Sequence, residues 1–165
     1  MATNRGLEGI VAAETRLSDV DGERGELTIA GFAVGELAAR ATFEETTWLL
    51  WHGDLPSREQ LDSFRGRLAA ARPLPPPTIA LLRECAAAAI EPMDALRVGA
   101  GTISLTAADA CTILAQLPTM IAAFWRLRRG SEPVAPRADL GHAANYLYML
   151  SGDVPDAERV RGLET

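Results

Sequence analysis

The side chains that could do chemistry in this chain are few and widely separated. There are two histidines, His52 and His142, and two cysteines, Cys85 and Cys111. A pair such as Cys111 with His142 could act as a nucleophile and its base, but it would need a third orienting group and a pocket. Both cysteines lie in apolar, alanine-rich stretches, so we expect buried free thiols in a reducing compartment.

The same residues give little support for a metal site. Zinc needs closely spaced ligands, and His52 and His142 lie on separate predicted helices. His52 is at a predicted helix end, where a capping or surface role is expected. Asp19, Asp21 and Glu23 alternate as in a calcium loop, but the glycine pattern and distal glutamate of an EF-hand are missing. A hairpin turn is favoured there, and we predict no metal ligand.

Cofactor and anion sites are also weakly indicated. Gly99 and Gly101 follow a predicted helix and lack the third glycine of a dinucleotide loop. Arg126, Arg128 and Arg129 could hold a phosphate, but cations at a helix C-terminus also offset the helix dipole. All 16 basic residues are arginine, which excludes Schiff-base chemistry, pyridoxal phosphate attachment and a P-loop lysine within the chain. We therefore predict no catalytic and no cofactor-binding residue here.

Length and composition favour one helical domain. The 165 residues are 48% hydrophobic and only 5% aromatic, which suits helices packed through small side chains. The net charge of −6 argues against a nucleic-acid partner. Residues 1–6 do not resemble a signal peptide, and we expect no stretch to reach the ~18 apolar residues of a membrane span. The expected location is the cytoplasm, with no membrane contact.

The elements that must position these side chains begin with a small β-hairpin. Residues 10–13 and 27–29 are short β-branched runs, and residues 19–25 between them have turn character. Helix signals take over from residue 33. We therefore predict a single fold over residues 1–165, with a hairpin region at 1–32 and a helical region at 33–165.

Capping residues and breakers mark the helices. Thr42–Glu45 and Ser57–Gln60 are capping-box patterns, and Gly53 is placed to end the first of these helices. Prolines at 73–77 predict an extended break. The helices expected after this break span residues 78–90, 93–97 and 139–150, with Gly152 as the final stop.

The most informative segment is a helix predicted over residues 106–129. Pro118 lies in its middle and should kink it. A helix that is apolar nearly all round is buried in a large protein or in a subunit contact, and an exposed one would bind a partner. One face carries apolar residues at helical spacing, namely Ala110, Ile113, Leu114, Leu117, Ile121, Phe124 and Trp125.

Eight different short motifs are spread along the chain from end to end. They are Gly6–Thr15, Ser18–Gly22, Ala41–Glu45, Leu49–Pro56, Pro92–Arg97, Leu117–Thr119, Arg128–Gly130 and Asn145–Gly152. Each is weak alone, but in this order and spacing they resemble bacterial citrate and 2-methylcitrate synthases. The resemblance implies the N-terminal part of a citrate synthase-like large domain, all-α apart from the small hairpin.

The resemblance also implies an activity. The family is dimeric and condenses acetyl-CoA with oxaloacetate to give citrate and CoA, so acetyl-CoA is expected as a substrate and no cofactor is expected. In the family an aspartate removes a methyl proton, one histidine polarises the thioester carbonyl and a second assists at oxaloacetate. These groups lie in the later half of the family's fold. We expect the chain to end, at Thr165, before them.

Two features of the matched region depart from the family. Ala30 stands where the family commonly has an arginine associated with the phosphates of CoA, and the segment between Leu96 and Ala110 looks shorter than usual. We therefore keep two hypotheses. The first is a part of a citrate synthase-like acyltransferase acting on oxaloacetate or a related 2-oxo acid. It would pair through helix 106–129 with a second copy or with a complementing C-terminal chain. The alternative is a non-catalytic helical module for dimerisation or regulation.

Overall fold

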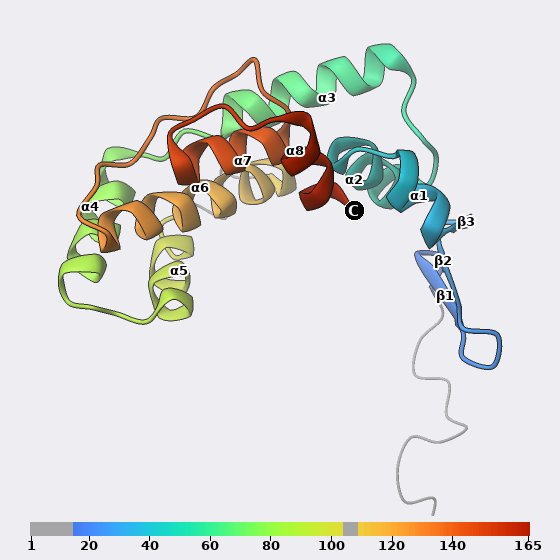
Figure 1. The fold of residues 1–165 in the computed structure, drawn as a ribbon, viewed down its shortest axis with the longest axis horizontal. Coiled ribbons are helices and arrows are strands. Elements are labelled where there is room, and N and C mark those ends of the chain that lie inside the picture. Colours follow the sequence, from blue (N-terminus) through green and yellow to red (C-terminus); the bar gives the residue numbers. More distant parts are fainter. Residues whose placement is uncertain (1–14, 104–108) are drawn as a thin grey trace, which may run out of the picture.

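The chain is mainly helical, with one small antiparallel sheet near its N-terminal end (Figure 1). The computed structural model describes residues 15–103 and 109–165. The eight helices and the small sheet in these residues confirm the predicted fold class. The elements are β1 (Ser18–Asp21), β2 (Glu26–Ile29), β3 (Phe32–Ala33), α1 (Val34–Arg40), α2 (Phe43–His52), α3 (Arg58–Ala71), α4 (Pro76–Ala87), α5 (Pro92–Ala100), α6 (Ala110–Arg128), α7 (His142–Ser151) and α8 (Ala157–Glu164).

The sheet has the order β1-β2-β3, with both pairs antiparallel. The predicted strand at 27–29 is confirmed as part of β2, whereas the one expected at 10–13 lies outside the described residues. The turn predicted over residues 19–25 is shorter in the structure, because residues 19–21 belong to β1 and pair with β2. Strand β1 is polar and exposed, so cross-strand pairing and not residue propensity forms it.

Local capping signals place the helix ends well. The hydroxyl of Thr42 accepts a hydrogen bond from the Glu45 amide, and the Glu45 carboxylate accepts one from the Thr42 amide, which completes the predicted capping box. Ser57 and Gln60 form the same arrangement at α3. The last turn of α2 is closed by a left-handed glycine, Gly53, at φ 90°.

Other boundaries differ from the prediction. Helix α4 begins at Pro76 and not at residue 78, because proline is well suited to the first turn of a helix. Helix α5 is longer than expected, and α7 starts three residues later than predicted, at His142. Helix α8 follows it and was not predicted at all. None of the residues of α8 is buried and half of them are charged, so the apolar signal by which helices are recognised is weak there.

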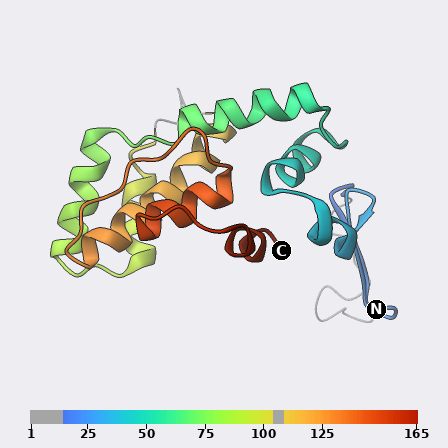
Figure 2. The same ribbon diagram turned by 45° about the horizontal axis from the view of Figure 1, so that its top comes forward.

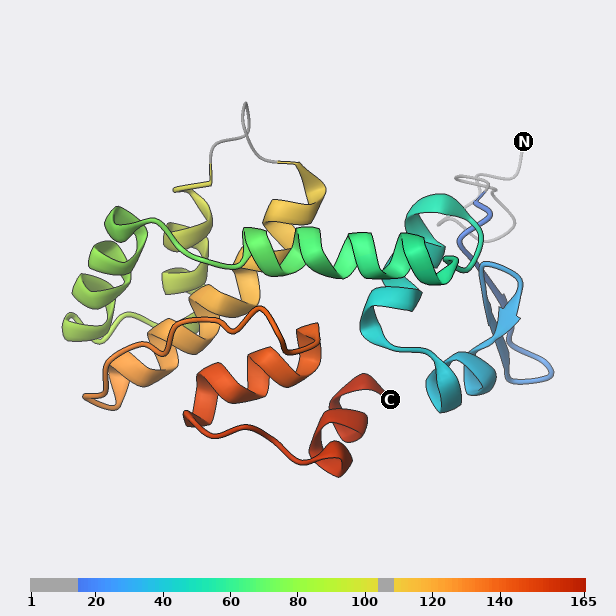
Figure 3. The same cartoon turned by 90° about the horizontal axis from the view of Figure 1, so that it is seen from above.

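Helix α6 is the centre of the core, with α3, α4, α5 and α7 packed around it (Figure 3). One buried cluster joins it to α4 and α5, and a second joins it to α3. The predicted helix is thus confirmed over 110–128, and it stays a single element through Pro118. The first cluster consists of Leu82, Cys85, Ala95, Met120, Ala123 and Phe124, and the second of Phe64, Leu68, Cys111 and Ala115.

The buried face of α6 is not the stripe expected from the sequence. Ile121 and Trp125, two members of that stripe, are 39% and 49% exposed. Small residues such as Ala115 and Ala122 are buried instead, because they let neighbouring helices approach closely. Contrary to our expectation, α6 is long and apolar enough to cross a membrane, by length and composition alone, with mean hydropathy 1.3 and 39% of its apolar stretch buried. The core helix of a soluble protein can be equally apolar, and α6 contributes to both buried clusters.

The molecule is elongated, and α3 connects its two ends. The hairpin, α1 and α2 lie at one end, and α4 and α5 lie at the other (Figures 2 and 3). Helix α8 is tied to the first end, because the Arg161 guanidinium donates to the carbonyl oxygens of Ala38 and Ala41, the latter at 3.1 Å. Helices α7 and α8 are therefore fixed against segments more than 90 residues earlier in the chain.

Candidate functional site: a buried polar cluster beside an apolar groove

Helix α7 begins on a buried carboxylate from a distant helix. Its own N-cap residue is Gly141, which has no side chain to accept the free amides. The Glu44 Oε1 atom of α2 accepts a hydrogen bond from the His142 amide at 2.8 Å, and Glu44 is only 1% exposed. An anion at a helix N-terminus is favoured by the helix dipole. Glu44 therefore caps α7 from outside and fixes it against α2.

A buried arginine completes this cluster. Arg72, at the end of α3, is 1% exposed and donates from Nη1 to the carbonyl oxygens of Arg137 and Leu140, at 2.9 and 2.8 Å. Burial lowers the pKa of Arg72, and the Glu44 carboxylate acts in the opposite direction. The loop before α7 is further held by Asn145, whose Oδ1 accepts from the Arg137 amide at 2.8 Å. We call Glu44, Arg72, His142 and Asn145 the polar cluster.

His142 is the least satisfied member of the polar cluster. Its ring is stacked on Phe43, with centroids 4.6 Å apart and planes 12° from parallel. The residue is 6% exposed, and within the described part of the chain neither ring nitrogen has a hydrogen-bond partner. Burial, together with the nearby Arg72 cation, lowers the pKa of His142 to about 4. The imidazole is therefore neutral at pH 7, with a donor at one nitrogen and an acceptor at the other, and both nitrogens are buried.

His142 is also one of the residues that line an apolar groove of about 400 Å³. Helices α6 and α7 form much of its wall, and α2 and α8 contribute one end each. Beyond His142 its polar groups come only from Tyr146 and Glu164, and burial raises the pKa of Tyr146. We call this the His142 groove. Its lining residues are Phe43, Leu114, Leu117, Pro118, Ile121, His142, Ala143, Tyr146, Leu163 and Glu164.

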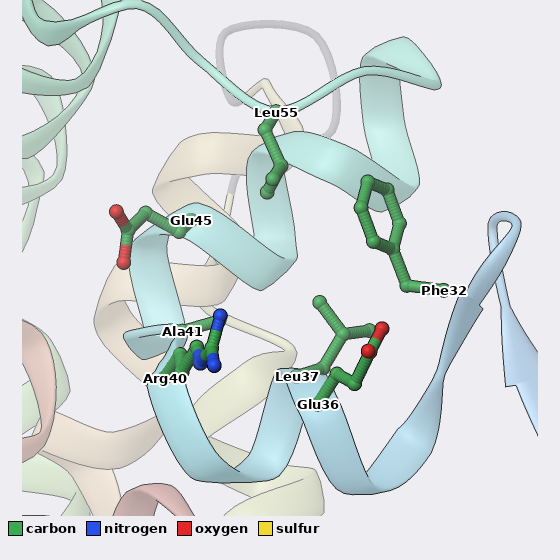
Figure 4. A pocket seen from close by; sticks show the side chains of 7 residues that line it. All are labelled: Phe32, Glu36, Leu37, Arg40, Ala41, Glu45 and Leu55. Carbon is green, nitrogen blue, oxygen red and sulfur yellow. The ribbon is translucent and has the colours of Figure 1, made fainter.

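A second hollow, of about 260 Å³, lies between β3, α1 and α2 (Figure 4). Arg40 and Glu45 lie on one flank of it, across from Phe32. The Glu45 carboxylate is already bonded to Thr42, and Glu36 adds a second negative charge. With one cation among two carboxylates, this hollow is a poor site for an anion such as a phosphate.

The structure does not bring together Cys111 and His142, the pair considered as a nucleophile and its base. Cys111 is buried beside Phe64 and Leu68, and burial raises the pKa of its thiol, which is the opposite of activation. Neither nitrogen of His142 bonds to it in the described chain. Both cysteines are free, as expected. His52 is exposed at the end of α2 and packs on Trp48, which confirms its surface role.

The remaining candidates have structural roles. The Asp21 carboxylate accepts from the amides of Glu23 and Arg24, which confirms the hairpin-turn interpretation. Arg126 donates to the Glu132 and Leu150 carbonyls and so joins α6 to the loop that follows it and to α7. Gly99 lies inside α5 against α4 and α6 and forms no nucleotide loop. In residues 15–103 and 109–165 no three acidic, histidine or cysteine side chains gather as metal ligands.

Sequence reasoning missed Glu44, Arg72 and Asn145. Their partners lie 98, 65 or 68, and 8 residues away, so the distant contacts leave no local pattern. The one available signal was the N-cap of α7. A glycine there cannot cap the helix, so an acceptor must come from elsewhere in the fold.

Known proteins match almost the whole chain. A family model described as "Citrate synthase, C-terminal domain" matches residues 6–165. The citrate synthase of Haloferax volcanii is 41% identical over 92% of this chain and 44% of its own length. The 2-methylcitrate synthase of Mycobacterium tuberculosis is 35% identical over 97% of this chain and 43% of its own length.

Solved structures agree with these matches. The citrate synthase of Pyrobaculum aerophilum superposes with a TM-score of 0.85 at 34% identity, covering 96% of this chain and 44% of that one. The chain thus spans less than half the length of the relatives it matches, which agrees with the expected resemblance to only part of the family's fold.

Proposed function

The chain belongs to the citrate synthase family, and we propose that it is one part of an acyltransferase that condenses acetyl-CoA with oxaloacetate or a related 2-oxo acid. In this reaction the acetyl methyl carbon bonds to the keto carbon of the acceptor. Water then cleaves the thioester and releases the CoA thiol. The observation that carries the proposal is the match of almost the whole chain to less than half of citrate synthases of known structure, at 34% identity.

In this proposal the chain supplies scaffold, and the reacting groups come from polypeptide outside it. The proposal is supported by how the polar residues of the chain are used. Glu44 and Arg72 are committed to backbone groups, and Cys111 is a buried thiol with a raised pKa. None is free to remove a proton from a substrate. We infer a soluble cytoplasmic protein that functions as a homodimer or with a complementing chain.

The relatives include both citrate and 2-methylcitrate synthases, so two acyl donors have to be tested. Ala30 bears on CoA binding. It stands at a tight turn between β2 and β3 with φ 46°, where the family commonly places an arginine associated with the CoA phosphates. We propose that CoA is held by other residues of the complete enzyme, with weaker contact to this turn.

The test is reconstitution. The chain is co-expressed with the part of the Pyrobaculum aerophilum citrate synthase to which it does not align, and the purified complex is assayed for thiol release. Acetyl-CoA and propionyl-CoA are each offered with oxaloacetate and with pyruvate. We expect thiol release with oxaloacetate, and a product of the mass of citrate. An intact complex that releases no thiol with any pair would contradict the proposal.

The alternative, a non-catalytic module for dimerisation or regulation, finds no support in the comparisons. The relatives described above are named as synthases, and the match runs through the whole chain and not through one contact surface.

A further inference from the structure

A serine follows the arginines at the C-terminal end of α6. In the sequence Arg128-Arg129-Gly130-Ser131, two cations stand two and three residues before a hydroxyl. Protein kinases choose their serines partly by the charges around them, and a kinase with an acidic substrate cleft takes serines preceded by arginines. The proposed function makes no use of this segment. The spacing of its charges indicates a phosphorylation site.

The way in which α6 ends leaves Ser131 accessible. The Ser131 amide donates to the Arg126 carbonyl at 2.9 Å, and the Gly130 amide donates to the Leu127 carbonyl at 3.0 Å. With Gly130 at φ 70°, this is a Schellman motif, which turns the chain away from the helix. Ser131 is exposed, and within residues 15–103 and 109–165 its hydroxyl has no hydrogen-bond partner. The hydroxyl of Ser57, by contrast, caps α3.

A hollow of about 210 Å³ beside Ser131 contains a cation for a phosphate. Arg83 of α4 lines this hollow with Ser131, and its guanidinium donates to both carboxylate oxygens of Glu132, at 2.9 and 2.6 Å. The ion pair joins α4 to the loop that leaves the C-terminal end of α6 (Figure 3). The two side chains are 47% and 75% exposed, so the pair is weak and can be exchanged. A phosphate accepts from a guanidinium in the same two-pronged way and carries more charge than a carboxylate.

We propose that Ser131 is a phosphorylation site for an arginine-directed serine kinase, and that Arg83 binds the phosphate once it is attached. The Ser131 Oγ attacks the γ-phosphorus of a nucleoside triphosphate held by the kinase. The Oγ–P bond forms, the bond from that phosphorus to the bridging β–γ oxygen breaks, the kinase takes the hydroxyl proton, and the nucleoside diphosphate leaves. The new phosphate repels the neighbouring Glu132 carboxylate and replaces it on Arg83. Phosphorylation thus changes the attachment of α4 to the loop that leads to α7.

The test is phosphorylation of the purified, folded chain by the catalytic subunit of cyclic-AMP-dependent protein kinase with magnesium ATP. Mass spectrometry should show a gain of about 80 Da, one phosphoryl group, on the peptide that contains Ser131. Ser131→Ala should abolish this gain. Ser63→Ala is the matched control, because Ser63 is an exposed serine of α3 with no arginine two or three residues before it. It should leave the rate unchanged.

Two arginine variants separate recognition by the kinase from binding of the phosphate. Arg129→Gln should slow phosphorylation at least about tenfold, since it removes one charge-assisted contact to the acidic cleft. Arg83→Gln leaves the arginines before Ser131 intact, so the chain should still be phosphorylated. The second pKa of the phosphate, about 6 without a cation nearby, is read by phosphorus NMR. It should be lower in the wild-type chain than in Arg83→Gln, because a cation favours the dianion.

Phosphorylation that is undiminished in Ser131→Ala, or as fast in Arg129→Gln as in the wild type, would overturn the assignment of the site. Failure of the folded wild-type chain to accept phosphate, with the kinase active on a standard peptide, would do the same. A phosphate pKa that is equal in the wild type and in Arg83→Gln would overturn the role of Arg83. None of these measurements involves thiol release, so they are independent of the proposed acyltransferase activity.

Discussion

Replacing Glu44 with alanine should destabilise the folded chain by about 3 kcal/mol. The Glu44 carboxylate accepts the His142 amide at 2.8 Å inside the protein, and a hydrogen bond to a charged group contributes about 1.5–3 kcal/mol. Its charge at the N-terminus of α7 adds about 0.3–1 kcal/mol. It also lies near two cations, Arg65 at 4.0 Å and the buried Arg72, which the substitution leaves without a counter-charge.

The assay is urea unfolding of the purified chain at pH 7, followed by circular dichroism. Glu44→Gln retains an acceptor for the amide and loses only the charge, so it should cost about 1 kcal/mol, near the charge contribution alone. Glu36→Ala, which removes an exposed glutamate from α1, is the control and should stay within about 0.5 kcal/mol of wild type. The reasoning is refuted if Glu44→Ala costs less than 1 kcal/mol, or if the glutamine variant is as unstable as the alanine one.

Four further substitutions probe the backbone and the polar cluster. Ala89 follows α4 at φ 54°, so Ala89→Gly should raise stability by about 1 kcal/mol in urea unfolding, and a loss would contradict the strained backbone. A Cβ at Gly99 would lie 3.2 Å from side chains of α4 and α6, so Gly99→Val should cost about 1–3 kcal/mol, whereas Gly66→Ala, on an open face of α3, should gain about 1. His142 has a pKa of about 4 in the fold against about 6.5 unfolded, so the fold binds this proton more weakly. The free energy of unfolding of the wild-type chain should therefore be highest above about pH 6.5. It should fall by about 3 kcal/mol, relative to that of His142→Phe, as the pH drops to 4. Equal pH profiles of the two proteins would refute it.

Helix ends could be predicted because their signals are local. Thr42 with Glu45, Ser57 with Gln60, and the glycine after α2 each act within one turn of the chain. Pro76 shows the limit of such rules, since the same residue that breaks a helix also starts one well. The sequence therefore predicts where helices lie more reliably than the residue at which each begins.

The site could not be predicted, because its contacts are long-range. Nothing near Glu44 indicates that its carboxylate caps a helix 98 residues away. The prediction of which face of α6 is buried was also wrong, for a physical reason. A helix apolar on several faces can bury any of them, and its neighbours selected the face with alanines and left Trp125 49% exposed. Family resemblance, which carries long-range information, supplied the fold family but none of the residues of the polar cluster.

The most direct measurement of the central claim is thiol release by the purified chain alone, with acetyl-CoA and oxaloacetate at saturating concentrations. If the chain is scaffold, with Glu44 and Arg72 committed to backbone groups, the rate should equal that of the buffer. It should rise only when the remaining part of a citrate synthase is added. Turnover by the chain alone that disappears in the His142→Phe variant would contradict this account, because it would place a reacting group inside the polar cluster.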